Sequence, residues 1–263
     1  LNLYTSMNTS LNWKIALITW ASSGIGRATA YAFAKAGVHL ILVSRSWAKL
    51  EGIKQNLTVK YSVNVHTSQC DVRDKDAVQK MVDELPHELR SVDILLNNAG
   101  LARGLEKIQD GKVEDWEEMI DTNVKWVLYV TRSILPLMIS RKTGHIIIIS
   151  SGAGRDVYVW GNVYHATKFA IEGLSKAIRM DLLDQHIKVS VIAPGMVDTD
   201  FHIVRVDWDV EKSRARLEWY HALSAEDVAD SILYCASVPD HVNISEIVIT
   251  PKAQAGTMIY KRA

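Results

Sequence analysis

A tyrosine and a lysine four positions apart are the first residues of this sequence that could do chemistry together. Tyr164 and Lys168 stand in the segment Tyr-His-Ala-Thr-Lys. On a helix, residues separated by four share one face, so the ammonium group would lie beside the phenol. A nearby positive charge lowers the pKa of tyrosine from its usual value of about 10, which makes the phenol a candidate general acid and base. With 9 tyrosines in the chain, one such pair is about an even bet by chance, so this spacing alone decides nothing.

A hydroxyl group stands upstream of this pair. Ser151 follows an apolar run at residues 145–150 that is typical of a strand. Its hydroxyl could donate to a carbonyl oxygen on which negative charge develops, although serine at a strand end is also a common turn residue. His165 follows Tyr164 directly and points to another part of the helix, so we interpret it as a packing or rim residue.

Two glycines mark a candidate phosphate site. Gly24 and Gly26 lie between an expected strand, residues 14–19, and an apolar helix, residues 27–36. Glycines at such a turn let backbone N–H groups approach a pyrophosphate, and the helix N-terminus adds partial positive charge. Glycines also serve simply as tight turns, but the position after the first strand favours a nucleotide.

Ser44 and Arg45 follow the second expected strand, about twenty residues beyond the glycines, where an acidic residue would hold the ribose of NAD. A guanidinium instead suits the 2′-phosphate of NADP. The sequence therefore favours NADP over NAD, and the alternative for Arg45 is a solvated loop charge.

Short β-branched runs alternate with longer amphipathic segments, which predicts an α/β fold: a single Rossmann-type domain with a doubly wound, seven-stranded parallel sheet and helices on both faces. Capping residues predict that helices begin at Asp74 and Ser224. We expect residues 1–12 to form a loose N-terminal leader, residues 13–263 to form the catalytic domain, and residues 200–223 to form a substrate lid or a surface helical hairpin. The expected strands, all apolar on both faces, are residues 14–19, 39–44, 64–71, 92–97, 145–150, 188–193 and 244–250.

Composition excludes several classes of protein. The chain has 263 residues, 30 basic and 30 acidic, and 48% are apolar, as in a soluble globular protein. Zero formal net charge argues against nucleic acid as a partner, and no apolar run approaches the ~20 residues that span a membrane. The two cysteines, Cys70 and Cys235, stand outside any disulfide or metal motif, so we expect no metal and a reducing, cytoplasmic location.

These motifs in this order resemble the short-chain dehydrogenase/reductase family. Further matches are Asn97-Asn98-Ala99-Gly100, Asp71-Val72, Asp-Thr-Asn-Val around Asn123, and the loop from Pro194 to Thr199. The resemblance implies hydride transfer between NADP and a CH–OH group, with Asn123, Ser151, Tyr164 and Lys168 as catalytic residues. Asn123 would support a water-linked proton path, Lys168 would hold the nicotinamide ribose, and Thr199 would contact the carboxamide. The cofactor-binding residues it implies are Thr19, Ser22, Ser23, Gly24, Ile25, Gly26, Ser44, Arg45, Asp71, Val72, Asn98, Ala99, Gly100, Tyr164, Lys168, Pro194, Gly195, Val197 and Thr199.

Within the family, residues 153–156, 201–205 and 249–254 look like the NADP-dependent 3-hydroxy acid (serine-type) dehydrogenase branch. Arg205 could pair with the carboxylate of such a substrate, or it could be a surface salt-bridge arginine. The family commonly forms tetramers through the helices after the fourth and fifth strands, so we expect a homotetramer or homodimer. A steroid, sugar or xenobiotic ketone is the alternative substrate.

Three residues depart from the family pattern. Trp20 stands where the family has its first glycine, and its indole would occupy ribose space or require a backbone shift. Trp126 replaces a glycine near Asn123 and would force helices apart or project into a groove. Ile148 replaces an asparagine of the fifth strand. A second function is therefore open: a non-catalytic cofactor-sensing or scaffold protein of the same fold, with impaired cofactor binding.

Overall fold

The computed structural model describes residues 10–205, 209, 211, 221–257 and 259–261. Most of the expected leader and of the expected lid lie outside these residues. Leu11 is nonetheless buried, and the backbone N–H of Trp13 donates to the Gly37 carbonyl oxygen over 3.1 Å. The end of the expected leader therefore packs against the domain.

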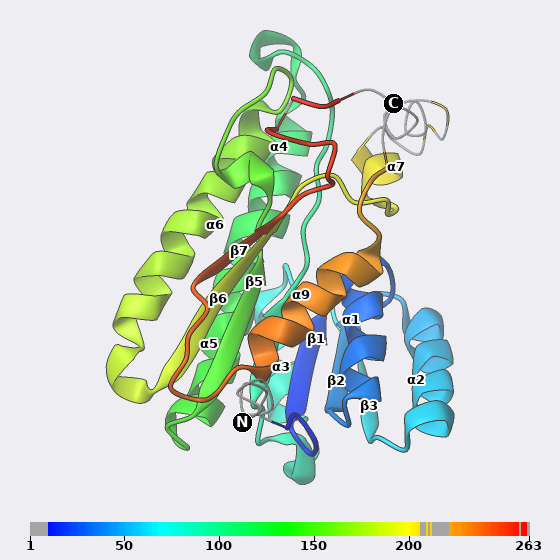
Figure 1. The fold of residues 1–263 in the computed structure, drawn as a ribbon, viewed down its shortest axis with the longest axis vertical. Helices are drawn as coiled ribbons and strands as arrows, with labels where there is room; N and C mark the ends of the chain where they lie inside the picture. Colours follow the sequence, from blue (N-terminus) through cyan, green and yellow to red (C-terminus); the bar gives the residue numbers. More distant parts are fainter. Residues whose placement is uncertain (1–9, 206–208, 210, 212–220, 258, 262–263) are drawn as a thin grey trace, which may run out of the picture.

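A seven-stranded sheet forms the centre of the molecule (Figure 1). All neighbouring strands are parallel, in the order β3-β2-β1-β4-β5-β6-β7. The chain reverses its direction of winding between β1 and β4, which is where doubly wound sheets bind ligands. The predicted fold class is confirmed. The strands are β1 (Ile15–Thr19), β2 (His39–Ser44), β3 (Val65–Gln69), β4 (Ile94–Asn97), β5 (Gly144–Ile149), β6 (Ile187–Pro194) and β7 (Glu246–Ile249).

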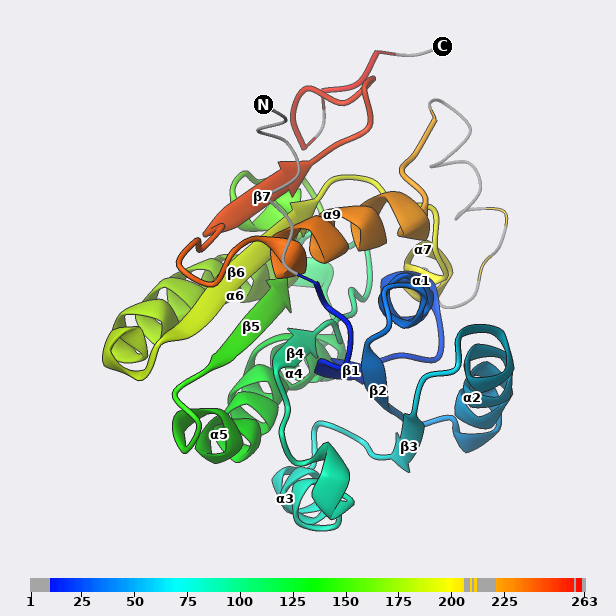
Figure 2. The same ribbon diagram turned by 60° about the horizontal axis from the view of Figure 1, so that its bottom comes forward.

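Helices cover both faces of the sheet (Figure 2). Each face is sealed by its own apolar cluster, one shared with α1, α2 and α9 and the other with α3, α5 and α6. Parallel strands between two helical layers are apolar throughout because neither of their faces meets water. The helices are α1 (Gly24–Lys35), α2 (Trp47–Tyr61), α3 (Lys75–Asp83), α4 (Val113–Ile120), α5 (Trp126–Ile139), α6 (Asn162–Asp181), α7 (Phe201–Arg205) and α9 (Ala225–Ser237).

The prediction that every strand is apolar on both faces is wrong at the two edges. In β7, Val248 is 53% exposed, and β3 alternates buried and half-buried residues. Edge strands have a neighbour on one side only, so the helical layers cover them less completely. Both predicted helix starts are confirmed: Asp74 accepts hydrogen bonds from two backbone N–H groups, and Ser224 forms a capping box with Asp227.

Three tryptophans adopt the left-handed backbone region that favours glycine. The φ angles are 69° at Trp13, 49° at Trp20 and 71° at Trp160. For an L-residue with a side chain this conformation costs about 1–2 kcal/mol. Trp20 thus keeps the turn that a glycine would make, and the expected backbone shift is not needed.

The two other unusual residues lie in the core. Trp126 is 1% exposed and packs in the same apolar cluster as Ile148, so the prediction that its indole projects into a groove is wrong. In the described part of the chain, the Trp126 ring nitrogen Nε1 has no hydrogen-bond acceptor. The buried Oδ1 of Asn97 likewise has no hydrogen-bond donor there. Asn97 and Ile148 are paired across β4 and β5. The isoleucine therefore gives that buried amide oxygen an apolar neighbour.

Candidate active site

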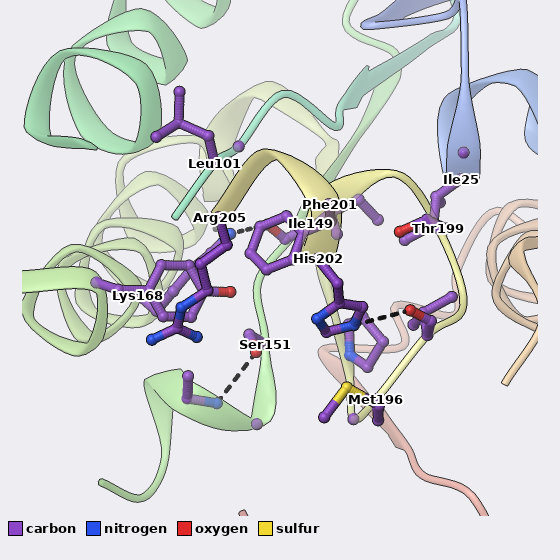
Figure 3. A pocket seen from close by; sticks show the side chains of 18 of the residues that line it. Ile25, Leu101, Ile149, Ser151, Lys168, Met196, Thr199, Phe201, His202 and Arg205 are labelled. Atoms are coloured by element: carbon purple, nitrogen blue, oxygen red, sulfur yellow. Dashed lines mark hydrogen bonds between the residues drawn. The ribbon is translucent and has the colours of Figure 1, made fainter. Parts of the chain in front are cut away.

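A pocket opens at the carboxyl ends of β1, β4, β5 and β6 (Figure 3). The parallel arrangement brings the loops that follow these strands to one edge of the sheet, although they lie far apart in sequence. Many of the predicted residues line this pocket, namely Ser23, Gly24, Ile25, Asn98, Gly100, Ser151, Tyr164, Lys168, Pro194, Gly195, Val197, Thr199 and Arg205.

The glycine turn packs closely against neighbouring protein atoms at Gly26 and leads into the first N–H groups of α1. A Cβ atom at Gly26 would lie 2.5 Å from the Trp20 carbonyl oxygen and 2.6 Å from Asn98 Nδ2, so no side chain fits there. Gly24 has a φ angle of 50° and begins α1. No acidic residue stands in the first turn of α1, and Ser23 does not cap it with its side chain. The first N–H groups of the helix can therefore serve an anion.

Thr19 and Asn98 tie the turn to the neighbouring strand. The Thr19 hydroxyl donates to the Leu96 carbonyl oxygen over 3.1 Å and accepts from the Asn98 N–H at 2.9 Å. Asn98 Nδ2 also donates to the Thr19 carbonyl oxygen at 3.1 Å. Thr19 and Asn98 therefore hold β1 and β4 in register at the switch point. Three predicted residues lie beneath the pocket rather than in its lining, namely Thr19, Gly26 and the buried Ala99.

The side chain of Trp20 lies at the Tyr164 end of the pocket. The half-buried indole lines the pocket and packs against the cluster that contains Leu101 and Tyr164. It also contacts the large core beneath α5 and α6. The indole therefore narrows the pocket beside the candidate catalytic residues.

An arginine that the sequence analysis missed, Arg73, follows β3 and binds the carboxylate of Asp71. Arg73 donates to both carboxylate oxygens of Asp71, with its shortest contact at 2.6 Å. These hydrogen bonds lower the pKa of Asp71. Because Arg73 donates to both oxygens of Asp71, this carboxylate already has a fixed orientation in the folded chain. The neighbouring Val72 is buried.

Ser44 and Arg45 leave β2 in different environments. Ser44 is buried, and its hydroxyl accepts from the N–H of Ser46 at 3.1 Å, which shapes the turn into α2. Arg45 is exposed. The guanidinium is therefore available to a solvent-side phosphate, whereas the serine hydroxyl serves the local turn. Ser22, like these two residues and the Asp71-Val72 pair, lies outside the pocket lining.

Tyr164 lies on α6 beside Ser151, and both line the pocket. Burial raises the pKa of the Tyr164 phenol above its usual value, and Tyr158 raises it further, whereas a hydrogen bond with Ser151 and the charge of Arg205 lower it. The expectation that Lys168 lowers this pKa is not met by the protein alone, because loss of hydration outweighs the nearby positive charges. Ser151 also accepts the Ala153 N–H at 3.1 Å (Figure 3).

Lys168 is buried one turn further along α6. Its ammonium nitrogen lies 6.0 Å from the centre of the Tyr164 ring and donates to the Ile149 carbonyl oxygen over 3.2 Å. Burial lowers the pKa of Lys168 to about 8, although the negative charge of Glu172 raises it. A Cβ atom at Gly100 would lie 3.3 Å from this nitrogen, so glycine keeps the approach to the ammonium open.

Asn123 stands in a turn of π-helix, Asp121–Lys125, between α4 and α5. Its Oδ1 accepts from the Leu101 N–H at 2.8 Å, and its Nδ2 donates to the Leu101 carbonyl oxygen at 2.8 Å and to the Thr167 hydroxyl at 3.0 Å. The side chain is 1% exposed. Asn123 therefore connects the loop after β4 to α6 and does not reach the pocket lining.

Arg205 ends α7 and is 3% exposed, so the alternative of a surface salt-bridge arginine is wrong. Its guanidinium donates to the Tyr158 hydroxyl at 2.6 Å, the Trp160 carbonyl oxygen at 3.2 Å and the Gly104 carbonyl oxygen at 3.3 Å. The carbon Cζ lies 5.5 Å from the centre of the Tyr164 ring. Among the described residues, no carboxylate forms a salt bridge with it.

Several pocket residues were not predicted. Gln254 accepts the Met196 N–H at 3.0 Å, and Thr257 and Tyr260 line the pocket with it. The His202 ring of α7 lies 3.1 Å from the Val197 carbonyl oxygen, a contact shown in Figure 3. The sequence marks residues 201–205 and 249–254 only as matches to one branch and residues 200–223 as an expected lid, and it assigns no role to His202 or Gln254.

Comparison with known proteins places the chain in a family. The model for short chain dehydrogenases matches residues 14–209. The NADP-dependent 3-hydroxy acid dehydrogenase YdfG of Salmonella typhi is 41% identical over 94% of this chain and 99% of its own length. Sulfoacetaldehyde reductase 2 of Chromohalobacter salexigens is 42% identical over 92% of this chain and 95% of its own.

A solved structure, the closed form of serine dehydrogenase complexed with NADP+, is 38% identical and superposes with a TM-score of 0.87 over 94% of this chain and 100% of its own. Serine dehydrogenase from Escherichia coli is 37% identical, with a TM-score of 0.79 over 92% of this chain and 99% of its own. The predicted family, and with it the prediction of an oxidoreductase, is confirmed. The chain belongs to the short chain dehydrogenase family.

Proposed function

We propose that the chain is an NADP-dependent oxidoreductase that interconverts a small hydroxy acid and its carbonyl form, with Tyr164 as general acid and base. The observation that carries this proposal is the buried guanidinium of Arg205, which lies 5.5 Å from the centre of the candidate catalytic phenol ring and donates to Gly104, Tyr158 and Trp160 but to no carboxylate among the described residues. A buried charge is normally paired, so an anionic substrate beside Tyr164 would complete the site.

The residues present fit a dinucleotide. The free N–H groups at the start of α1 suit a pyrophosphate. Arg45 would pair with the 2′-phosphate of NADP, and the spare N–H donors of Lys168 would bind ribose hydroxyls. When bound, the nicotinamide supplies or accepts the hydride. Trp20, which lines the pocket, opposes this fit.

Tyr164 moves the proton in this proposal. Its raised pKa keeps the phenol protonated, so it can donate to a carbonyl oxygen during reduction. In the other direction the phenolate must form, and the charge of Arg205 and the hydrogen bond with Ser151 favour it. Ser151 donates to the same substrate oxygen as negative charge develops there. Lys168 stabilises the phenolate through its charge, and Asn123 holds the loop and helix between which a water-linked proton path would run.

Arg205 binds the acid group of the substrate. A guanidinium has five N–H donors, and three of them are used by Gly104, Tyr158 and Trp160. One N–H on each terminal nitrogen is left for a carboxylate. The relatives agree with a small anion, since their names specify a hydroxy acid, serine and sulfoacetaldehyde.

Steady-state kinetics with NADP+ and 3-hydroxypropanoate test this function, with the methyl ester of the same acid as an uncharged substrate. We expect Tyr164→Phe to lower kcat at least about 1,000-fold with an unchanged circular dichroism spectrum. We expect Arg205→Met to raise KM for the acid about tenfold or more and to leave KM for the ester within about twofold. Failure of the wild-type chain to bind NADPH at millimolar concentration would instead favour the non-catalytic cofactor-sensing or scaffold protein.

The proposed oligomeric state rests on exposed apolar side chains, and the proposed location rests on two free thiols. Large apolar side chains are exposed on α5 and α6, the helices expected at the subunit contact, including Leu128 at 43% and Phe169 at 45%. A homotetramer or homodimer would bury them, and light scattering during gel filtration measures which of these forms. Cys70 and Cys235 are buried and free, as in a cytoplasmic protein.

A further inference from the structure

His165 makes two hydrogen bonds that a packing residue would not need. The ring is 4% exposed on α6. Its Nδ1 lies 2.9 Å from the Ala153 carbonyl oxygen, and its Nε2 accepts from the Tyr158 N–H at 3.0 Å. An N–H group can only donate, so Nε2 carries no hydrogen and Nδ1 must be the protonated nitrogen. The surroundings thus select the neutral ring with its hydrogen on Nδ1.

The segment from Gly152 to Gly161 wraps around this ring. The Tyr158 ring meets the imidazole edge to face, with ring centres 4.1 Å apart and planes at 72°. A Cβ atom at Gly161 would lie 2.2 Å from His165 Nε2, so the loop can close on the ring only because residue 161 is glycine. The other side-chain contacts of this loop are exposed or only partly buried: Asp156 with Thr257, Arg155 with Glu246 and Glu172, and Tyr158 with Arg205. The imidazole is therefore a buried support of the loop.

Both ends of the supported loop reach the reacting groups. At one end, the N–H of Ala153 donates to the Ser151 hydroxyl oxygen. At the other end, the Tyr158 hydroxyl accepts from Arg205 at 2.6 Å, and the same guanidinium lies 5.4 Å from the centre of the Tyr158 ring. A displacement of the loop would therefore move the groups that meet the substrate oxygen and the substrate acid group.

We propose that His165 is a positioning residue that holds the loop of residues 153–158 so that Tyr158 presents Arg205 to the acid group of the substrate. The inference rests on the proposed function for the identity of that substrate. His165 does not contact the substrate, and its two bonds have separate tasks. The bond to Ala153 orients the Ser151 side, and the bond to Tyr158 orients the Arg205 side.

Three variants separate these tasks. His165→Phe keeps a ring of similar size and loses both bonds. His165→Gln places its amide oxygen near the former Nε2 and can still accept from Tyr158, whereas His165→Asn places its amide nitrogen near the former Nδ1 and can still donate to Ala153. As a matched control, Tyr158→Phe removes the hydroxyl that contacts Arg205 but leaves both His165 bonds in place.

Two measurements on the full chain test the proposal. Hydrogen exchange, read by mass spectrometry on the peptide of residues 152–161, reports loop order without requiring turnover. KM for 3-hydroxypropanoate and for its methyl ester, both with NADP+, reports use of the acid group. We expect His165→Phe to speed exchange about tenfold and to raise KM for the acid about tenfold, with KM for the ester and the Kd for NADPH within about twofold.

The pattern among the other variants sharpens the test. We expect His165→Gln to stay closer to wild type than His165→Asn in KM for the acid, because it keeps the bond on the Arg205 side. Tyr158→Phe should raise KM for the acid without faster exchange. The proposal is overturned if His165→Phe leaves exchange unchanged, or if exchange rises while the preference for the acid over the ester is retained. If the wild-type chain does not oxidise the acid with NADP+, the proposed function fails, and the exchange result alone decides whether His165 supports the loop.

Discussion

Replacing Lys168 with methionine should change how stability depends on pH. Lys168 is 5% exposed, and among the described residues its ammonium group donates to the Ile149 carbonyl oxygen at 3.2 Å. Burial lowers its pKa from 10.5 to about 8. Methionine has a similar length and no charge, so the variant removes this titration while preserving most of the packing.

The direction of the effect follows from proton binding. Below about pH 8, Lys168 is protonated in both the folded and the unfolded chain, so it contributes no pH dependence. Between pH 8 and 10.5 the folded chain has released the proton and the unfolded chain keeps it, so the free energy of unfolding rises with pH. One pKa unit corresponds to about 1.4 kcal/mol. Over the full window the gain is about 3 kcal/mol, and between pH 7 and pH 9 it is about 1 kcal/mol.

Other groups titrate in a similar pH range, and their contributions to the pH dependence of stability must be cancelled. Burial raises the pKa of Tyr164 and raises that of Cys70 to about 11, so both oppose the effect at higher pH, whereas the lowered pKa of Lys188 adds to it. All three are present in both proteins. The difference between wild type and variant therefore isolates Lys168.

Urea unfolding of the cofactor-free proteins at pH 7 and pH 9 measures this difference. We expect the free energy of unfolding of Lys168→Met relative to wild type to fall by about 1 kcal/mol between the two pH values, with unchanged m-values. Lys176→Met is the matched control, because Lys176 lies on the same helix with its side chain 61% exposed. The free energy of unfolding of Lys176→Met should change between pH 7 and pH 9 by the same amount as that of wild type. Parallel profiles for Lys168→Met as well would refute the claim that a buried ammonium is deprotonated this early.

Three further outcomes follow from the site. Trp20→Gly should tighten NADPH binding severalfold by fluorescence titration and change stability by no more than about 1 kcal/mol, because relief of the left-handed backbone offsets the lost indole contacts; unchanged affinity would mean that the indole does not obstruct the cofactor. Arg45→Ala should weaken NADPH about tenfold and leave NADH unaffected; an equal loss for both would exclude a 2′-phosphate contact. Asn123→Ala should lower the free energy of unfolding in urea by about 2 kcal/mol, since the Leu101 N–H loses its acceptor; no loss would show that water replaces the amide.

The sequence was sufficient for the order of elements and for most of the pocket. Strand runs, the glycine turn and the Tyr-x-x-x-Lys spacing are local signals, and each depends on residues close together in the chain. The carboxyl ends of parallel strands must meet at one edge, so these local signals also locate the site. The predicted helix starts at Asp74 and Ser224 are confirmed for the same reason, because a capping residue acts within one helical turn.

The sequence was insufficient where the outcome depends on distant neighbours. The sequence predicts that Trp126, in place of a glycine, forces helices apart or projects into a groove, yet its indole is 1% exposed and packs in the apolar cluster shared with α3, α5 and α6. The pKa of Tyr164 was expected to fall because Lys168 is close in sequence, but burial is a property of the whole fold. Arg73 was missed because only the folded chain shows that its guanidinium turns back onto Asp71.

The tryptophans at left-handed turns have a consequence for heat resistance. Trp13 and Trp160 are 73% and 49% exposed and lie on separate loops. Glycine at either position would relieve about 1–2 kcal/mol of backbone strain, against about 0.4–1 kcal/mol for the greater entropy of the unfolded chain and the lost contacts of the ring. Distant sites add their effects, so the double replacement would raise the melting temperature by about a degree or two. Two substitutions in surface turns can thus raise thermal stability without any repacking of the interior.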